Sequence, residues 1–135
     1  IQAVPAMREA GYEVAVLSLD APRLADVGYD VLLDGVEVVE VGRLRLHVLA
    51  TPGHTPGSVC FRLDGSSFLF TGDTLFPGGP GATAYEGGDF PTIITSISTT
   101  LFALPDTTIV LPGHGADTTI GAERPHLDAW ITRGW

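Results

Sequence analysis

Three apolar stretches of the chain each end at a glycine that is followed by a side chain able to bind a metal ion. They are residues 46–51 before Gly53-His54, residues 68–71 before Gly72-Asp73, and residues 108–111 before Gly113-His114. Short apolar runs bounded by turn residues predict buried strands, and glycine lets the backbone turn sharply where a strand ends. This repetition constrains the fold strongly, because mixed α/β proteins place their sites in the loops at one edge of a sheet.

Two imidazoles and one carboxylate form a donor set suited to Zn²⁺ or Fe²⁺. Taken singly, each residue has an ordinary structural interpretation. Pro-Gly-His is a common turn, and Asp73 between Gly72 and Thr74 can cap a loop. Three independent turns seldom repeat one pattern, so together they favour a shared metal site formed by His54, Asp73 and His114, with structural turns as the alternative.

The other two histidines and the cysteine are expected outside this site. His47 alternates with arginines on the polar side of its strand, which predicts a solvated side chain, and His126 follows Pro125 in a helix, which predicts a surface or packing role. Cys60 lies within an apolar run, so we expect a buried and unreactive thiol. A single cysteine excludes an internal disulfide and is typical of a reducing compartment, which favours a cytoplasmic location.

Composition excludes several classes of function. The chain has 135 residues, of which 44% are hydrophobic, which predicts one domain with a real core rather than a disordered segment. A compact chain of this size exposes roughly 6,800 Å². Seven arginines and no lysine face sixteen acidic residues, and the net charge of −9 disfavours nucleic acid as a partner. No apolar run is long enough to span a bilayer, so we expect no membrane-spanning segment.

The order of expected elements predicts mixed α/β layers, with one sheet covered by helices on one side. Apolar patterns and turn residues predict helices at 4–10, 91–104 and 122–132. Strands are expected at 13–19, at 108–111, and in two hairpins, 36–41 with 43–50 and 58–63 with 67–71. Residues 21–29 and the glycine-rich segment 72–90 are expected to be loops.

The three ligand segments resemble the later motifs of the metallo-β-lactamase-fold hydrolases, and in particular their glyoxalase II-like branch. The matching segments are Thr51-Pro-Gly-His-Thr-Pro-Gly-Ser58, Phe70-Thr-Gly-Asp-Thr-Leu-Phe76 and Leu111-Pro-Gly-His-Gly115, followed by Thr118-Thr-Ile-Gly-Ala-Glu123. The motifs occur in the family's order, and the resemblance runs over residues 1–135. It implies that this chain is the C-terminal half of an αββα sandwich, a partial domain in which the N-terminal half is absent.

The resemblance also implies a set of metal ligands. In the family, an H-x-H-x-D-H motif precedes a helix similar to residues 1–10, and this chain is expected to begin just after that motif. Carried over by position, His54 would complete the three-histidine set of a first metal, Asp73 would bridge both metals, and His114 would complete the set of the second. The absent motif would supply four more ligands. Two zinc ions are expected in the complete site, with iron or manganese as alternatives.

The activity implied by the resemblance is hydrolysis of a small-molecule thioester or small ester, as in hydroxyacylglutathione hydrolases. Water activated by the metals would attack the carbonyl, with Asp73 as the catalytic bridging residue. Tyr85 and Glu86 lie in a segment that resembles the mouth of the family's site, although an ordinary surface loop explains them equally well. Residues 1–135 alone are expected to be inactive until the N-terminal half or a partner chain completes the site.

Three alternatives remain open from the sequence. An iron-dependent persulfide dioxygenase of the same fold carries similar motifs. A non-catalytic remnant or binding module would retain the same segments as structural turns. A dimer that assembles its site across two copies would hold metal only in the oligomer.

Overall fold

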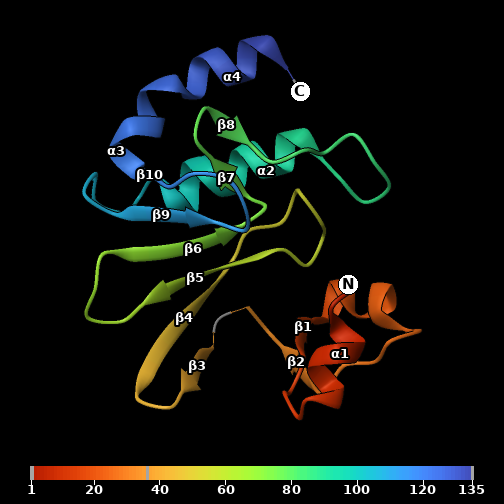
Figure 1. Ribbon diagram of the computed structural model, residues 1–135. Helices are drawn as coiled ribbons and strands as arrows, with labels where there is room; N and C mark the ends of the chain where they lie inside the picture. Colours follow the sequence, from red (N-terminus) through yellow and green to blue (C-terminus); the bar gives the residue numbers. More distant parts are fainter. Residues whose placement is uncertain (1, 36, 135) are drawn as a thin grey trace.

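A computed structural model of the chain describes residues 2–35 and 37–134, and a six-stranded sheet lies at its centre (Figure 1). The strands lie in the order β10-β9-β6-β5-β4-β3, and all neighbours are antiparallel except β6 and β9, which are parallel. Their bounds are β3 Val38–Val41, β4 Leu44–Ala50, β5 Val59–Leu63, β6 Phe68–Gly72, β9 Ile109–Pro112 and β10 Thr118–Thr119.

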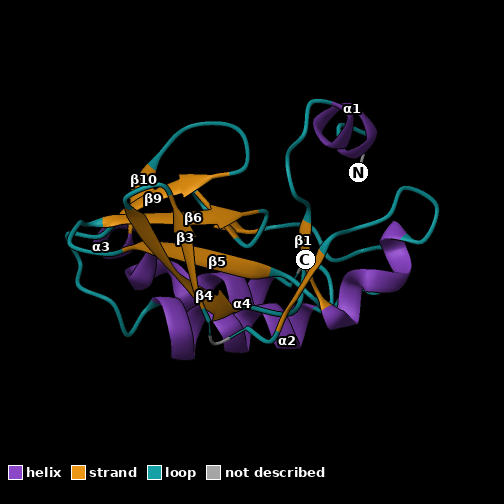
Figure 2. Ribbon diagram, turned by 90° about the horizontal axis from the view of Figure 1, so that it is seen from below, coloured by secondary structure: helices purple, strands orange, loops and turns teal. Residues whose placement is uncertain are grey.

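Helices cover one face of this sheet, as the sequence predicted (Figure 2). They are α2 Phe90–Ser96 with its π-helical continuation Ile97–Leu101, α3 Ile120–Glu123, the 3₁₀ turn Arg124–His126, and α4 Leu127–Arg133. The core lies between the two layers and consists of Cys60, Leu69, Leu75, Ile93, Ile97, Leu101, Phe102, Val110, Ile120 and Trp130. Within the described ranges, none of the helices combines the length and the apolar character needed to cross a bilayer.

The helix predicted at 91–104 forms where its apolar stripe and its first turn favour it. The Asp89 carboxylate accepts a hydrogen bond from the Thr92 amide at 2.7 Å and so caps the N-terminus. Ile97 and Leu101 are completely buried against the sheet. The Ser96 hydroxyl donates to the Pro52 carbonyl at 2.7 Å, which ties the helix to the segment before His54.

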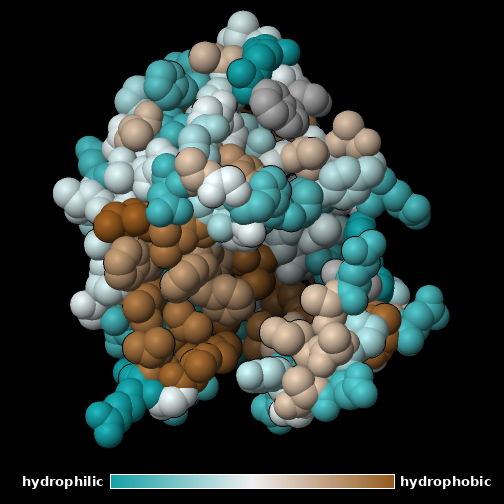
Figure 3. Space-filling model, viewed as in Figure 1, coloured by the Kyte–Doolittle hydropathy of each residue, from teal (hydrophilic) through white to brown (hydrophobic). Residues whose placement is uncertain are grey.

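The opposite face of the sheet, here called the outer face, is apolar and largely uncovered. Cross-strand pairing places Leu46 opposite Leu63 and Phe61 opposite Phe70. Side chains of paired residues share a face, so this face is lined with aliphatic and aromatic groups. Phe70 keeps 40% of its surface exposed, and Figure 3 shows the hydrophobic patch over the region of β3 to β6. The chain exposes 7669 Å², more than the roughly 6,800 Å² of a compact protein of this size.

A small N-terminal lobe lies beside the sheet (Figure 1). It contains α1 Val4–Glu9, β1 Ala15–Leu17, the 3₁₀ helix Ser18–Leu24, and β2 Val31–Leu33, which pairs in parallel with β1. Arg8 forms an ion pair with Asp30 at 2.9 Å and donates to the Val27 carbonyl at 3.1 Å, so α1 is fastened to the end of the lobe.

The structure corrects several predicted element bounds. The strand expected at 13–19 covers only Ala15–Leu17, because a 3₁₀ helix begins at Ser18. This helix extends to Leu24, into the segment 21–29 that was predicted as a loop. The segment 72–90, predicted as loop throughout, contains the antiparallel pair β7 Leu75–Phe76 and β8 Gly79–Pro80. A 3₁₀ turn around Pro125 divides the last helix. Residue 36, part of a predicted strand, lies outside the described residues.

Adjacent residues on β6 provide a test of the two faces. We expect Leu69→Thr, at a completely buried position, to lower the free energy of unfolding by about 2–5 kcal/mol. Phe70→Thr, the same new side chain on the outer face, should cost less than about 1 kcal/mol and reduce self-association. Urea denaturation and sedimentation velocity measure these two effects. Equal losses of stability at both positions would contradict the exposed outer face.

Candidate metal centre

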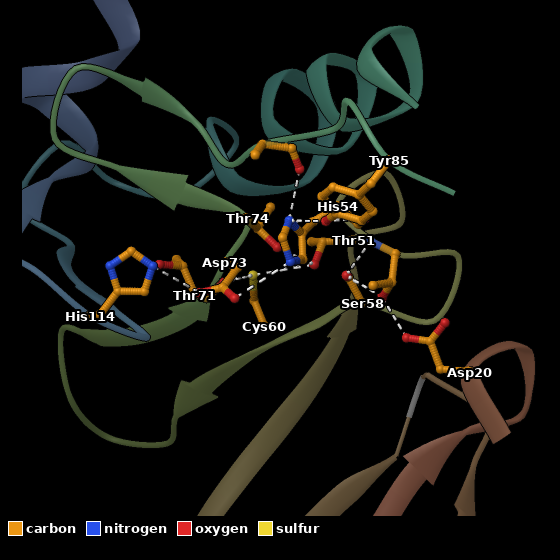
Figure 4. Close-up of polar contacts among 12 residues, drawn as sticks. Asp20, Thr51, His54, Ser58, Cys60, Thr71, Asp73, Thr74, Tyr85 and His114 are labelled. Carbon is orange, nitrogen blue, oxygen red and sulfur yellow. Dashed lines mark hydrogen bonds and ion pairs between the residues drawn. The ribbon is translucent and has the colours of Figure 1, made fainter. Parts of the chain in front are cut away.

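The ends of three strands meet at one edge of the sheet and carry the three predicted ligands there. Since β4 and β6 are each antiparallel to β5, and β9 is parallel to β6, the strands β4, β6 and β9 all run in one direction. His54 Nε2 lies 3.4 Å from one Asp73 carboxylate oxygen, Oδ2, and His114 Nε2 lies 3.7 Å from the other, Oδ1 (Figure 4). Asp73 therefore stands between the two imidazoles.

The donor chemistry suits a divalent cation, but these residues do not enclose one. Across residues 2–35 and 37–134, no group of three or more His, Cys, Asp or Glu side chains is arranged to hold a metal ion. The side chain of His54 is 23% exposed, that of Asp73 42% and that of His114 76%. The three residues thus form two adjacent pairs that share one carboxylate, on an open edge where further ligands have access.

Hydrogen bonds orient the His54 ring. Its Nδ1 lies 2.8 Å from the Ala82 carbonyl oxygen, and because a carbonyl only accepts, Nδ1 carries the proton. The Tyr85 hydroxyl donates to the His54 carbonyl oxygen at 2.7 Å and also contacts Nδ1. In the neutral ring the lone pair is then on Nε2, facing Asp73. Two electron-pair donors that face each other in this way are stabilised by a shared cation, either a proton or a metal ion.

Close packing explains the glycine before each histidine. Gly53 has a φ of +136°, and a Cβ there would lie 2.4 Å from the backbone of Ile93 in α2. A Cβ on Gly113 would lie 2.8 Å from Asp73 Oδ1. The Gly113 amide also donates to the Gly72 carbonyl at 2.7 Å, which joins the two loops that carry Asp73 and His114. Any side chain at position 53 or 113 would displace a ligand or the helix beneath it.

Asp20 of the N-terminal lobe anchors the loop that carries His54. Its carboxylate accepts hydrogen bonds from the Gly57 amide at 3.0 Å and from the Thr55 hydroxyl. Arg23 lies 3.5 Å from Asp20 and donates to the Glu86 carbonyl at 2.7 Å, which links the lobe to the segment of Tyr85. Asp20 could not be predicted from the sequence, because no local motif indicates contact between positions 35 residues apart.

A buried layer of hydroxyl groups lies beneath the ligands. Thr51 and Thr74, on the loops of His54 and Asp73, are buried with their hydroxyl oxygens 3.3 Å apart. Cys60 lies beside Thr51 and is completely buried, and burial raises the pKa of its thiol to about 11. The prediction of a buried Cys60 is confirmed, and its thiol stays protonated at neutral pH.

Two cavities open on either side of His54 and Asp73. One, of about 330 Å³, extends over His114, Phe76 and the glycine-rich segment 77–82. The other, of about 480 Å³, is lined by residues of the N-terminal lobe together with Tyr85. Burial, and then the charge of Asp73, raise the pKa of the Tyr85 hydroxyl. Tyr85 therefore lies at the candidate site, whereas Glu86 lines a separate depression with Arg23.

The remaining histidines lie elsewhere. His47 is partly buried, and its Nε2 lies 3.3 Å from Asp64 in the β5–β6 turn, where the sequence predicted a solvated ring. Hydrogen bonding to His47 holds the pKa of the Asp64 carboxyl below its usual value. His126 is exposed, as expected. Neither ring is among the residues that line the two cavities.

Removing the Asp20 anchor should loosen the His54 loop. In Asp20→Ala the Gly57 amide and the Thr55 hydroxyl lose a charged acceptor, so we expect exchange of the Gly57 amide hydrogen to accelerate by about tenfold or more. Asp26→Ala, at an exposed carboxylate of the same lobe, serves as the matched control. Hydrogen exchange followed by NMR measures both variants. Identical Gly57 rates in the two would show that Asp20 does not hold the loop.

Known proteins are similar to this chain in sequence and in fold. The chain is 41% identical over 95 residues to the probable metallo-hydrolase YqgX of Bacillus subtilis, covering 70% of this chain and 45% of that protein. It is 43% identical over 88 residues to the hydroxyacylglutathione hydrolase GloC of Haemophilus influenzae, covering 65% and 42%. The aligned region thus spans less than half the length of these curated relatives.

Solved structures superpose on most of the chain. The BLEG-1 B3 metallo-β-lactamase does so with a TM-score of 0.84 and 34% identity, over 92% of this chain and 68% of that one. ETHE1 from Myxococcus xanthus gives a TM-score of 0.79 and 35% identity, over 93% and 55%. TTHA1623 in a di-iron-bound form gives 0.69 and 34%, over 90% and 67%. The sequence profile of the Metallo-beta-lactamase superfamily matches residues 3–114, and the chain therefore belongs to that superfamily.

Proposed function

We propose that this chain is part of a metal-dependent hydrolase that cleaves a thioester or small ester, as hydroxyacylglutathione hydrolases do. The observation that carries the proposal is the meeting of His54, Asp73 and His114 at one edge of the sheet. The identity to GloC supports a thioester substrate. The net charge of −9 supports a small-molecule substrate over nucleic acid. The single, buried Cys60 supports a cytoplasmic location.

In this proposal the imidazoles of His54 and His114 would hold metal, and Asp73 would be the catalytic residue, as the carboxylate that both imidazoles face. Bound divalent ions supply a Lewis acid and lower the pKa of bound water. The chain's own residues place the donors: Ala82 and Tyr85 orient the His54 ring, and the small residues at 78–82 leave space beside Asp73 for a substrate. Zinc is the metal we propose, with manganese as a second possibility.

We further propose that another polypeptide segment completes the centre. Three ligands are too few for a two-metal site, and the four more that the family resemblance implies would come from outside residues 1–135 or from a partner chain. The apolar outer face supports this proposal, because a soluble chain rarely leaves such a surface uncovered. The same segment would bury Phe68 and Phe70 and bring the missing ligands to the open edge beside Asp73. Residues 1–135 alone should therefore hydrolyse little or nothing.

An iron-dependent dioxygenase is the second candidate. Its support is the similarity to ETHE1 and to a structure determined in a di-iron-bound form. The two candidates differ in metal and in reactant: a hydrolase needs only water, whereas a persulfide dioxygenase consumes oxygen. Metal analysis and oxygen uptake with glutathione persulfide therefore separate them.

Asp73→Ala tests whether the site is a metal centre. We expect the purified chain to bind one divalent ion weakly, and Asp73→Ala to abolish that binding with only a modest change in stability. Asp64→Ala, in the β5–β6 turn, removes a carboxylate far from the cavities and should bind metal like the unmodified chain. Elemental analysis, cobalt titration and urea denaturation measure these outcomes. In the gene with its flanking coding sequence, Asp73→Ala should lower thioester hydrolysis by at least about a hundredfold.

Two results would contradict these expectations, the first the weak binding of metal by the chain alone and the second the metal centre itself. An unmodified chain holding less than about a tenth of an equivalent of metal would show that the three residues form no site without their partner. A large loss of stability in Asp73→Ala, without any effect on metal content, would favour the non-catalytic remnant, in which these segments are structural turns.

A further inference from the structure

Glu123 is a buried carboxylate that the proposed chemistry does not use. It lies at the end of α3, only 5% exposed. One oxygen, Oε2, accepts a hydrogen bond from the Gly78 amide at 2.9 Å, and the other, Oε1, accepts one from the Thr118 hydroxyl at 2.6 Å. Both donors are neutral. Burying a carboxylate costs desolvation free energy, and hydrogen bonds to its oxygens offset part of that cost.

The bond from the Gly78 amide holds the tight turn between β7 and β8. Phe76 pairs with Gly79, and Pro77-Gly78 forms the turn between them. This turn forms one wall of the cavity beside Asp73. Glu123 therefore joins α3, which packs on the sheet, to the exposed tip of this turn.

The turn carries the ring that lies against His114. The ring centroids of Phe76 and His114 are 4.7 Å apart, with an angle of 36° between their planes. The His114 side chain is the most exposed of the three candidate ligands, at 76%. In the described part of the chain, the His114 imidazole contacts the side chains of Asp73 and Phe76.

We propose that Glu123 is a positioning residue for His114. By accepting the Gly78 amide, the buried carboxylate fixes the β7–β8 turn, and the turn presses the Phe76 ring against the imidazole. Ala82 and Tyr85 orient the His54 ring by direct hydrogen bonds. Glu123 orients His114 indirectly, through the β7–β8 turn and Phe76. The role of His114 as a metal ligand rests on the proposed function, whereas the contact between Phe76 and His114 does not depend on it.

Substitutions at position 123 distinguish hydrogen bonding from packing. Glu123→Met keeps the length of the side chain but leaves the Gly78 amide without an acceptor. Glu123→Gln is the conservative variant, since its carbonyl accepts from Gly78 and its amide donates to a rotated Thr118 hydroxyl. Asp117→Ala, at an exposed carboxylate next to Thr118, is the control for charge. Phe76→Leu removes the ring and defines the His114 signal without it.

The readouts are taken on the metal-free chain by NMR. The ring protons of His114 report the Phe76 ring through its ring current, and exchange of the Gly78 amide hydrogen reports the buried acceptor. We expect Glu123→Met to move the His114 protons toward their Phe76→Leu positions and to accelerate Gly78 exchange by about tenfold or more. Glu123→Gln and Asp117→Ala should resemble the unmodified chain. Cobalt affinity should fall about tenfold or more in Glu123→Met and Phe76→Leu.

The proposal is overturned if Glu123→Met keeps both the His114 proton positions and the Gly78 exchange rate of the unmodified chain. If that variant does not fold, Glu123→Asp decides, because it keeps the charge but withdraws the carboxylate from the Gly78 amide by one methylene. It should shift His114 in the same direction and accelerate Gly78 exchange, and unchanged values of both overturn the proposal. If the unmodified chain binds no cobalt, the expectation that these residues hold metal without a further segment fails, and the NMR measurements still decide the role of Glu123.

Discussion

The parallel pairing of β6 with β9 is the contact on which the candidate site depends. Two strands that pair in parallel end at the same edge, so the loops that carry Asp73 and His114 emerge side by side. The hydrogen bond from the Gly113 amide to the Gly72 carbonyl closes this junction. Because β4 runs in the same direction, His54 joins the other two ligands at that edge.

Around this edge the chain holds each histidine by contacts from distant segments. Asp20 in the N-terminal lobe fixes the His54 loop, and Glu123 near the C-terminus holds the turn behind His114. Both are carboxylates that accept backbone amides, a strong hydrogen bond because the acceptor is charged. The two candidate histidine ligands thus stand beside segments that are held by acids from opposite ends of the chain.

The two faces of the sheet differ in burial, because helices cover one face and the other is largely exposed. Helices bury one face, where Leu69 and Val110 are completely inaccessible, while Phe68 and Phe70 stand exposed on the other. The open edge beside Asp73 has the same character, since it offers two ligand pairs without enclosing a cation. An uncovered apolar face and an incomplete donor set are both accounted for if one further polypeptide segment packs there.

The sequence by itself predicted the family and the central strands β3, β4, β5, β6 and β9, because motif order, apolar periodicity and turn residues are local properties. The same local patterns singled out His54, Asp73 and His114 as candidates, and the structure places these three side chains together. Asp20 and Glu123 could not be assigned roles, because the segments they hold, at Thr55 and Gly78, lie 35 and 45 residues away and no local pattern records such contacts. The pair β7 and β8 was likewise hidden within a glycine-rich segment, since two-residue strands have no periodicity. Tertiary packing alone decided which acids hold the ligand loops and which face of the sheet stays bare.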